Sequence, residues 1–398
     1  MSERGPWRIA VVGQRGVPAT FGGIERHVEE IGARLAARGH EVTVFLRSGY
    51  VTDAPRTHRG MRLRQVPTVS SKRLECIVHS ALCTCLTLRS APDIVHYHAL
   101  GPSLLAPLPR LFSRARVVAT VHGLDHEREK WGFGARCLLR AGGWTSAHVP
   151  DATIVVSRAL ADHYALHHHR TAVHVPNGVT IPVHRPAREI TERFGLRPNG
   201  YLLFVGRLVP EKAVDLLVRA FGDLPGEMRL VVAGGSSHTD EYTRRVRELA
   251  AQDSRVILTD YVYGPTLDEL YSNAAAFVLP STVEGLPLTL LEAASHGTPV
   301  VASAIAPHLE VLGGDGPGHR LFAPRDRAGL TAAMRRVLED PPDERRGAAV
   351  LRERVLATYS WDEAALATER VYAELLARRG RAPRRAAPED VPLAEAAS

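Results

Sequence analysis

Short apolar runs alternate with longer amphipathic segments along most of the chain. Runs rich in Val, Ile and Leu, bounded by glycine or polar residues, predict buried strands. The strands predicted in this way are 8–12, 41–46, 61–66, 93–97, 116–121, 152–156, 172–175, 201–205, 230–233, 256–258, 275–279 and 299–302. Apolar residues at helical spacing predict amphipathic helices between them, over 24–38, 74–88, 104–112, 214–221, 241–251, 266–273, 288–296 and 361–379. This alternation predicts parallel, doubly wound sheets.

The order of strand, glycine loop and helix occurs twice, once at the start of the chain and once in its middle. Gly13 follows the first strand, and Gly206 follows the strand 201–205. Between the two units, Pro176–Gly178 form a turn, and 179–199 contains three prolines and is the expected linker. At 398 residues the chain is long enough for two domains of ordinary size.

Composition indicates a soluble globular protein. Apolar residues make up 45% and charged residues 23% of the chain. The start of the sequence has no secretory signal pattern, and no apolar run approaches the length of about 20 residues that spans a bilayer. The net charge of +7 favours anionic ligands or membrane surfaces but is not a nucleic-acid signature. We therefore expect a cytoplasmic protein.

Neither the cysteines nor the histidine triplet predicts a metal site. Three of the four cysteines, Cys76, Cys83 and Cys85, share one apolar segment without the paired spacing of a zinc site. Together with Cys137 they are expected to be reduced, buried thiols. The triplet His167–His169 is better explained as a solvated helix end, because no acidic residue or cysteine is spaced to complete a site.

The most informative stretch is 280–292, P-S-T-V-E-G-L-P-L-T-L-L-E. It follows an apolar strand and precedes a helix, with Pro287 expected in the first turn and Gly285 at a sharp bend. A helix start offers free N–H groups and the positive end of the dipole to an anion such as a diphosphate. Glu284 and Glu292 bracket this site, and carboxylates accept hydrogen bonds from sugar hydroxyls.

Two cations and several histidines also lie at predicted strand ends. Arg207 and Lys212 follow the mid-chain strand, in the sequence G-R-L-V-P-E-K, and suit the oxygens of a diphosphate. His96 and His98 close one strand of the first half, and His122 closes the next. For a single histidine at a strand end, a structural role and a functional role are about equally expected.

Taken together, these motifs resemble the signature of retaining GT-B glycosyltransferases of family 4. The resemblance rests on Glu-x7-Glu in its loop, on the G-R-L-x-x-x-K pattern and on the glycine pair Gly22 and Gly23. It covers nearly the whole chain. The opening Q-R-G-V-P-A-x-F-G-G-I-E is similar to a bacterial subgroup that transfers rhamnose or builds polysaccharides.

The resemblance implies a GT-B fold, an α/β architecture of two Rossmann-like doubly wound domains that face a central cleft. The first, acceptor-side domain would span 1–182 and the second, which binds a nucleotide sugar, 183–360. The helix 361–379 would cross back to the first domain, and 380–398, rich in Ala, Pro and charge, would be a disordered tail.

The resemblance also implies transfer of a sugar from a nucleotide-diphosphate-sugar, with anomeric retention and without a metal ion or other cofactor. Arg207 and Lys212 would stabilise the leaving diphosphate, Glu284 and His122 would hold the donor sugar, and Glu292 would bind the ribose. The implied donor-binding residues are Gly22, Gly23, Gly206, Val262, Gly285, Leu286 and Glu292. Weaker candidates for contact with the acceptor are Asp125, His126 and His98.

Three alternatives remain open from the sequence. A nucleotide-sugar epimerase of the same two-domain form would change the sugar without an acceptor. A non-catalytic sugar-nucleotide-binding protein would keep the cations but would not need His122 or Glu284. A glycosidase also uses two acids, but hydrolysis does not need the paired cations.

The acceptor could be a sugar, a lipid-linked sugar or a small molecule. The segment 104–116 mixes apolar residues with Arg110, Arg114 and Arg116 and could contact an anionic membrane on its inner face. A packed helix with a basic end is the favoured interpretation of this segment.

Overall fold

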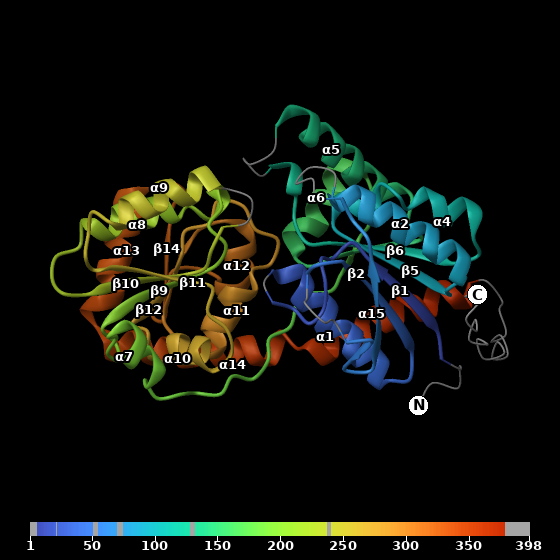
Figure 1. The fold of residues 1–398 in the computed structure, drawn as a ribbon. Helices are drawn as coiled ribbons and strands as arrows, with labels where there is room; N and C mark the ends of the chain where they lie inside the picture. The colour runs from blue at the N-terminus through green and yellow to red at the C-terminus, as the bar shows by residue number, and fades with distance from the viewer. Residues whose placement is uncertain are drawn as a thin grey trace, which may run out of the picture.

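The computed structural model describes residues 6–20, 22–50, 55–69, 75–127, 132–236 and 240–378. The chain forms two α/β domains, each built on a central sheet with helices on both faces (Figure 1). This confirms the predicted fold class of two parallel-sheet domains. The tail predicted to be disordered, 380–398, lies outside the described residues.

The first domain contains an eight-stranded sheet in the order β3-β4-β2-β1-β5-β6-β7-β8. Its pairs are parallel, except that the edge strand β3 pairs antiparallel with β4. The strands are β1 Arg8–Val12, β2 Glu41–Arg47, β3 Thr57–His58, β4 Met61–Val66, β5 Ile94–His98, β6 Arg116–Val121, β7 Ala152–Val155 and β8 Val173–His174. The helices are α1 Gly23–Ala37, α2 Glu75–Ser90, α3 Leu100–Ser103, α4 Pro107–Phe112, the 3-10 turn η1 Asp125–Glu127, α5 Phe133–His148 and α6 Arg158–His168.

The second domain contains a six-stranded parallel sheet in the order β11-β10-β9-β12-β13-β14. Counted from its own first strand, this is the 3-2-1-4-5-6 order of dinucleotide-binding sheets. The strands are β9 Tyr201–Val205, β10 Arg229–Ala233, β11 Val256–Asp260, β12 Ala276–Leu279, β13 Val300–Ser303 and β14 His319–Phe322. The helices are α7 Glu189–Phe194, the 3-10 turn η2 Pro210–Lys212, α8 Val214–Gly222, α9 Asp240–Ala250, α10 Gly264–Asn273, α11 Leu288–Ser295, α12 Ala306–Leu312, α13 Arg327–Glu339 and α14 Pro341–Thr358.

Alternating side chains of the first sheet feed two separate cores. Ile9 and Val11 of β1 pack with α1 and with the last helix, α15 Trp361–Ala377. Ala10 and Val12 point the other way and pack in a core that includes Cys83 of α2. This alternation is what a strand covered on both faces requires.

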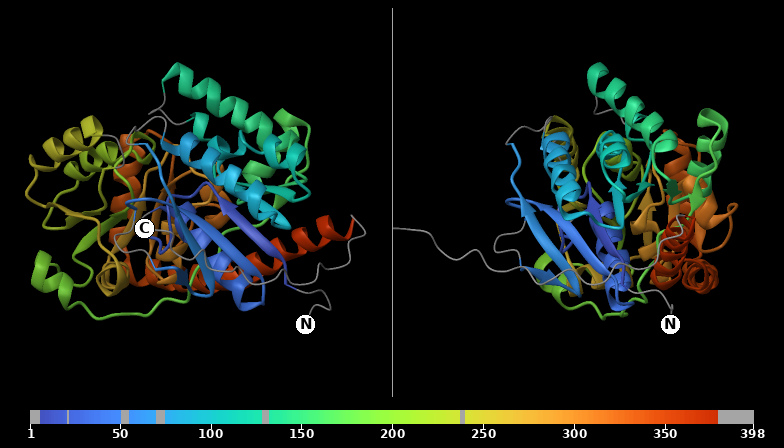
Figure 2. Two further views of the ribbon diagram at one scale, coloured as in Figure 1. Left: turned by 45° about the vertical axis from the view of Figure 1, so that its right-hand side comes forward. Right: turned by 90° about the vertical axis from the view of Figure 1, so that its right-hand side faces the viewer.

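The last helix of the chain packs on the first domain although it follows the second. Trp361, Tyr372 and Leu375 are buried in the core beneath β1 and α1. Glu369 accepts hydrogen bonds from Arg38 and His40 at 2.5 and 2.9 Å. In the left-hand view of Figure 2, α15 runs along the first domain.

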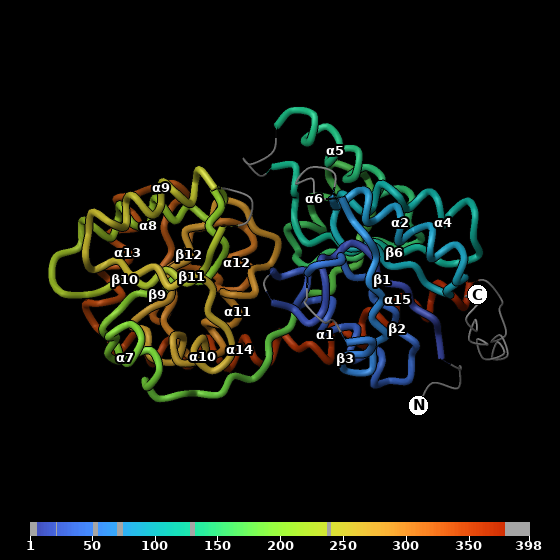
Figure 3. The backbone as a smooth tube through the Cα atoms, viewed as in Figure 1, coloured from blue at the N-terminus to red at the C-terminus, as the bar shows by residue number. Residues whose placement is uncertain are grey.

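The two crossings between the domains lie against each other, along one side of the molecule (Figure 3). The amide of Val179 donates to the carbonyl of Tyr359 at 2.9 Å. A Cβ on Gly178 would lie 2.2 Å from the amide nitrogen of Trp361, so this position has no room for a side chain. The turn predicted at Pro176–Gly178 is therefore a packed crossing point.

Several local predictions were wrong. The segment 104–112 is not one helix, because the chain breaks between α3 and α4 before Pro107. No helix was predicted in the linker segment 179–199, which contains the short α7, capped by Glu269 of α10 through the amides of Arg188 and Ile190. All four cysteines are free, but Cys85 and Cys137 are exposed rather than buried.

The docking of α15 can be tested at Tyr372, whose hydroxyl lies 2.6 Å from Nδ1 of His96 in β5. Replacing Tyr372 by Phe should lower the free energy of unfolding by about 1–3 kcal/mol, because a buried imidazole nitrogen loses its partner. The measurement is urea unfolding followed by circular dichroism. The control is Glu374→Gln on the exposed side of α15, expected within about 0.5 kcal/mol of the parent chain. Equal stability of both variants would contradict the assigned contact.

Candidate active site

The candidate site lies where loops that follow strands of the two sheets meet. Gly285, in the loop between β12 and α11, packs against the loop after β6. A Cβ on Gly285 would lie 1.9 Å from the carbonyl oxygen of His122. The role of this glycine is therefore close approach of the two domains, and not only the predicted bend. Pro287 lies one residue earlier than predicted, at the N-cap of α11.

Lys212 and Glu284 form an ion pair at this junction, with Nζ and Oε1 2.5 Å apart. Their side chains are each only 12% exposed. The two loops are also joined by the amide of Thr282, which donates to the carbonyl of Glu211 at 2.8 Å. Burial alone would raise the pKa of Glu284, but the Lys212 ammonium holds it below its ordinary value. Glu284 is therefore ionised at neutral pH.

Acid should weaken this ion pair. Because the folded-state pKa of Glu284 lies below its ordinary value of 4.5, the pair contributes stability above that pH and loses it as the pH falls further. We expect the midpoint of urea unfolding to fall more steeply below about pH 4.5 in the parent chain than in Glu284→Gln, which cannot titrate at this position. Parallel curves for the two proteins would show that Glu284 titrates normally.

Glu292 lies in α11, the helix that follows the loop with Glu284, and its environment differs from that of Glu284. The Tyr271 hydroxyl donates to its Oε2 at 3.1 Å. Burial raises the pKa of Glu292, while that hydrogen bond and the positive charge of Arg26, from the first domain, oppose the rise. The two acids predicted to share the site therefore have separate partners, a cation for Glu284 and a phenol for Glu292.

Glycines bring the backbones at the mouth of the site close together. A Cβ on Gly234 would lie 1.8 Å from the carbonyl oxygen of Gly206, so the loops after β9 and β10 touch. Gly22 is the N-cap of α1 with φ of 104°. A Cβ on Gly23 would meet only Leu288 Cδ1, at 3.7 Å, which places the starts of α1 and α11 beside each other.

Arg207 and Val262 lie on the side of the site formed by the second domain. Burial raises the pKa of Tyr261, and the charges of Arg207 and Arg15 oppose that rise, which indicates that both cations lie near this ring. Val262 is only 8% exposed, so its backbone is the part that could contact a ligand. Tyr261 stacks on the half-exposed Tyr263, with ring centroids 6.0 Å apart, a feature that the sequence reading missed.

The histidines predicted at strand ends form a cluster. His98 Nδ1 lies 3.0 Å from Nε2 of His122. His98 is almost fully buried and lies beneath the partly exposed His122. His96 bonds Tyr372 and Thr120 and serves the core. Burial lowers the pKa of His98 well below its ordinary value and that of His96 to about 3, so both are neutral.

Two residues of this cluster were missed from the sequence. His27, on the buried side of α1, has its ring centroid 4.7 Å from that of His122. Its Nδ1 lies 2.9 Å from Oδ1 of Asn177, and the Asn177 amide nitrogen donates to the carbonyl of Leu286 at 3.1 Å. Asn177 thus joins the first domain to the loop that carries Glu284. The signal for His27 was a polar residue on the apolar face of a predicted helix.

The weaker acceptor candidates lie beside a small inter-domain cavity. Asp125 and His126 belong to η1, and their neighbours Leu124 and Glu127 line a cavity of about 160 Å³. Thr282, Val283 and Glu284 line it from the second domain. Glu127 of η1 and Glu284 therefore line one cavity.

His308 is a further neighbour of Glu284 that the sequence did not indicate. It is fully buried near the start of α12, and its Nδ1 donates to the carbonyl of Ser303 at 2.8 Å. Its Nε2 has no hydrogen-bond partner among the described residues. Burial lowers the pKa of His308 to about 4, so the ring is neutral beside the ionised Glu284.

Two of the three arginines in the segment considered for membrane contact form ion pairs with one aspartate. Leu111 and Phe112 at the end of α4 are exposed, but Arg110 and Arg116 both pair with Asp151, at 2.6 and 2.7 Å. In the part of the chain that the structure describes, every helix is too short or too polar to span a bilayer. Membrane contact at this segment stays a prediction.

Two Rossmann-like domains that bring a cation, two acids and helix starts to one junction define the architecture of a GT-B glycosyltransferase. Known structures agree on the fold. Sucrose-phosphate synthase from Thermosynechococcus elongatus superposes with a TM-score of 0.81 at 24% identity, over 94% of this chain and all of that one. Anabaena HepE in complex with UDP and glucose superposes with a TM-score of 0.77 at 16% sequence identity, over 92% of this chain and 99% of that one.

Sequence comparison places the chain in a family. Residues 21–181 match the model "Glycosyltransferase Family 4", and 199–340 match "Glycosyl transferases group 1". Glycogen synthase from Mycobacterium tuberculosis is 31% identical, over 94% of this chain and 95% of that one. D-inositol 3-phosphate glycosyltransferase from Acidothermus cellulolyticus is 30% identical, over 95% of this chain and 93% of that one. The chain belongs to glycosyltransferase family 4.

Proposed function

We propose that this glycosyltransferase moves a sugar from a nucleotide-diphosphate-sugar to an acceptor hydroxyl with retention of anomeric configuration. The observation that carries the proposal is the junction itself, where the Lys212–Glu284 pair of the second domain lies next to the contact between Gly285 and His122. The second domain contributes cations suited to a diphosphate, and the first domain contributes histidines suited to a sugar.

The cations have the central chemical role. When the bond between the anomeric carbon and the diphosphate breaks, negative charge collects on the departing phosphate oxygens. Lys212 and Arg207, with the amide groups at the start of α11, would stabilise that charge without rearrangement, because the fold already holds them. This role needs no metal ion, and we propose that transfer is metal-independent.

Two carboxylates and one histidine would orient the donor. Glu284, kept ionised by Lys212, would accept hydrogen bonds from hydroxyls of the transferred sugar. Glu292 would accept from the ribose, with the backbone of Val262 near the base. His122 would donate to or accept from the sugar, while the buried His98 would orient the His122 ring rather than touch a substrate. Gly22, Gly23, Gly206 and Leu286 would contribute backbone.

The acceptor would enter from the cavity between η1 and Glu284. Leu124 and Glu127, the neighbours of Asp125 and His126, line it on the first domain, so an acceptor bound there would present its hydroxyl toward the donor sugar. In a single displacement, retention requires attack from the side on which the diphosphate departs. The departing phosphate oxygen would then be the nearest base for the proton of the acceptor hydroxyl.

Similarity to enzymes named for glycogen synthesis and for transfer to inositol phosphate supports a role in polysaccharide, glycolipid or glycoconjugate synthesis. A cytoplasmic site of action fits such a role, since nucleotide sugars are the co-substrate. Contact with the inner face of the membrane would bring a lipid-linked acceptor within reach. Sedimentation with vesicles of anionic lipid tests that last point, and absence of co-sedimentation would remove it.

The experiment on function incubates the chain with a panel of nucleotide sugars, each with and without a set of acceptors. Release of nucleoside diphosphate that requires an acceptor is expected, in the presence of a chelator as well as without it. Nuclear magnetic resonance of the product then gives the anomeric configuration. An altered sugar still attached to its nucleotide would identify an epimerase. Binding without turnover would identify a non-catalytic binding protein.

A further inference from the structure

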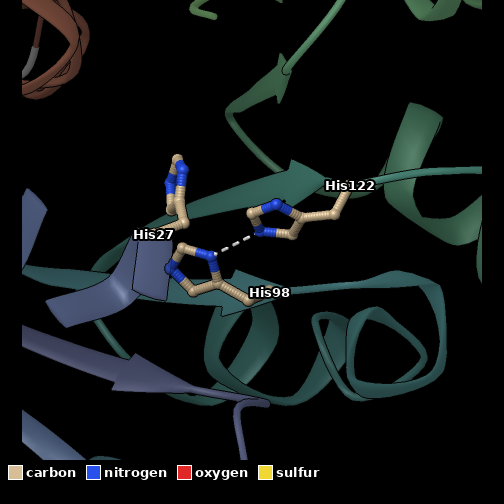
Figure 4. Close-up of side chains that lie close together, drawn as sticks. All are labelled: His27, His98 and His122. Carbon is tan, nitrogen blue, oxygen red and sulfur yellow. Dashed lines mark hydrogen bonds between the residues drawn. The ribbon is translucent and has the colours of Figure 1, made fainter. Parts of the chain in front are cut away.

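The imidazoles of His27, His98 and His122 converge from three different elements of the first domain (Figure 4). His27 comes from α1, His98 ends β5, and His122 follows β6. One ring nitrogen of each lies within 4.8 Å of the others. His27 and His98 are almost fully buried, and His122 is partly exposed at the domain junction.

The protonation of these rings is set by their neighbours. The Asn177 amide nitrogen donates to the Leu286 carbonyl, so its oxygen faces His27 and accepts the Nδ1–H. His27 therefore keeps its available lone pair on Nε2. A ring nitrogen fixed by a carbonyl oxygen on its far side is the usual support of a metal-binding histidine.

We infer that His27, His98 and His122 form a binding site for a divalent transition-metal ion such as Zn²⁺. Neutral imidazole is the ligand form that zinc prefers, at about 2.0–2.1 Å, and three protein ligands leave a fourth position for water or substrate. Nitrogens around a tetrahedral ion lie roughly 3.3 Å apart. The spacing of His98 Nδ1 and His122 Nε2, 3.0 Å, is already close to this value, although both rings must turn toward a shared ion, and His27 must approach by at most about 1.5 Å.

Binding has a defined proton balance. In the absence of an ion, one of the two rings donates the hydrogen bond between His98 Nδ1 and His122 Nε2. An ion ligated by both nitrogens displaces that proton, which moves to the outer nitrogen of the same ring or to solvent. No oxidation or reduction is involved, because Zn²⁺ has a single accessible oxidation state.

The site has a consequence for activity that rests on the proposed function. His122 is the imidazole assigned to the donor sugar, and it cannot serve a sugar while it ligates an ion. Zn²⁺ should therefore inhibit transfer, and saturating nucleotide sugar should protect against it. Catalysis without a metal and inhibition by one are compatible, since the ion occupies the position of the sugar.

The test uses the full-length, untagged chain, freed of metal with a chelator and studied without donor. Zn²⁺ affinity is measured by competition with a chromophoric chelator, and Co²⁺ absorption reports the coordination geometry. We expect one Zn²⁺ per chain and a tetrahedral Co²⁺ spectrum. His122→Asn should abolish both signals. Asn177→Ala, which removes the support of His27, should weaken binding roughly 10- to 100-fold.

The matched control removes a second pair of histidines. His163 and His167 of α6, in the same domain but outside the triad, stack with ring centroids 4.3 Å apart. The double variant His163→Gln and His167→Gln should bind Zn²⁺ like the parent chain. Circular dichroism checks that each variant is folded. If His122→Asn is not folded, His27→Gln replaces it with the same expected loss.

Loss of Zn²⁺ in the α6 double variant, or its retention in His122→Asn and His27→Gln, would overturn the inference. So would the absence of stoichiometric binding to the parent chain. The outcome is separable from that of the proposed function, because binding is read without donor. A chain that binds Zn²⁺ through the triad but transfers no sugar would refute only the function.

Discussion

Replacing Lys212 by alanine is expected to lower kcat for sugar transfer about 10²–10³-fold, the effect of removing one preorganised group that stabilises developing negative charge. Binding of the intact donor should change much less, because the charge on the diphosphate grows as the bond to the sugar breaks. The measurement is initial rates of nucleoside diphosphate release over a range of donor concentrations. Unchanged turnover would remove the central claim of the proposed mechanism.

A second variant separates the two roles that Lys212 could have. If Lys212 only neutralises Glu284, then Glu284→Gln combined with Lys212→Ala should be no worse than Glu284→Gln alone. If Lys212 acts on the diphosphate, the double variant should lose most of the remaining activity. Arg327→Ala, which removes an exposed ion pair with Asp223 at 2.7 Å, is the matched control and should leave kcat unchanged.

The strands that the sequence located are those with strong local signals. β1, β4, β6 and β9 begin and end at the predicted residues. β1, β6 and β9 are buried runs between glycine or polar boundaries, whereas β4 buries only Met61 and Val66 at its two ends. β14 was missed, since His319–Phe322 has two polar residues followed by two apolar ones and therefore shows no strand periodicity. β3 is a two-residue edge strand with no apolar pattern at all.

Helices that depend on distant contacts could not be predicted. α7 lies in a proline-containing segment, and its first amides are held by Glu269, about 80 residues away. α5 contains Gly142 and Gly143, and the local sequence around two adjacent glycines predicts the end of a helix rather than its interior. In the fold, a Cβ on Gly142 would lie 2.3 Å from the carbonyl oxygen of Leu100, so the glycine permits close packing of α5 on α3.

In the candidate site, too, the residues with a local sequence motif were predicted and the contacts between distant residues were not. Motifs predicted that Lys212 and Glu284 belong to one site, but only the fold shows that they form an ion pair. His27 and Asn177 escaped notice because each has an ordinary local explanation, a helix residue and a turn residue. Their interaction joins positions 150 residues apart within the first domain, and only the fold shows that Asn177 also donates to the carbonyl of Leu286 in the second domain.

Substituting Gly285 by alanine is expected to reduce transfer at least as strongly as loss of a single charge, by preventing the domains from meeting. The added Cβ would lie 1.9 Å from the His122 carbonyl oxygen and 2.7 Å from its carbon, and both belong to rigid backbone. The loop that carries Gly285 and the loop after β6 must therefore separate, which moves Glu284 away from His122. A misplacement of about 1 Å can cost roughly 100-fold in rate.

The expected pattern for Gly285→Ala is a fall in kcat with the second domain still folded and still able to bind nucleoside diphosphate, measured by calorimetry. Gly134→Ala is the matched control, since a Cβ there meets nothing within 4 Å in the described part of the chain. That variant should transfer sugar like the parent. Full activity in Gly285→Ala would mean that the contact with His122 is not part of the state that reacts, and that the domains work further apart than they lie here.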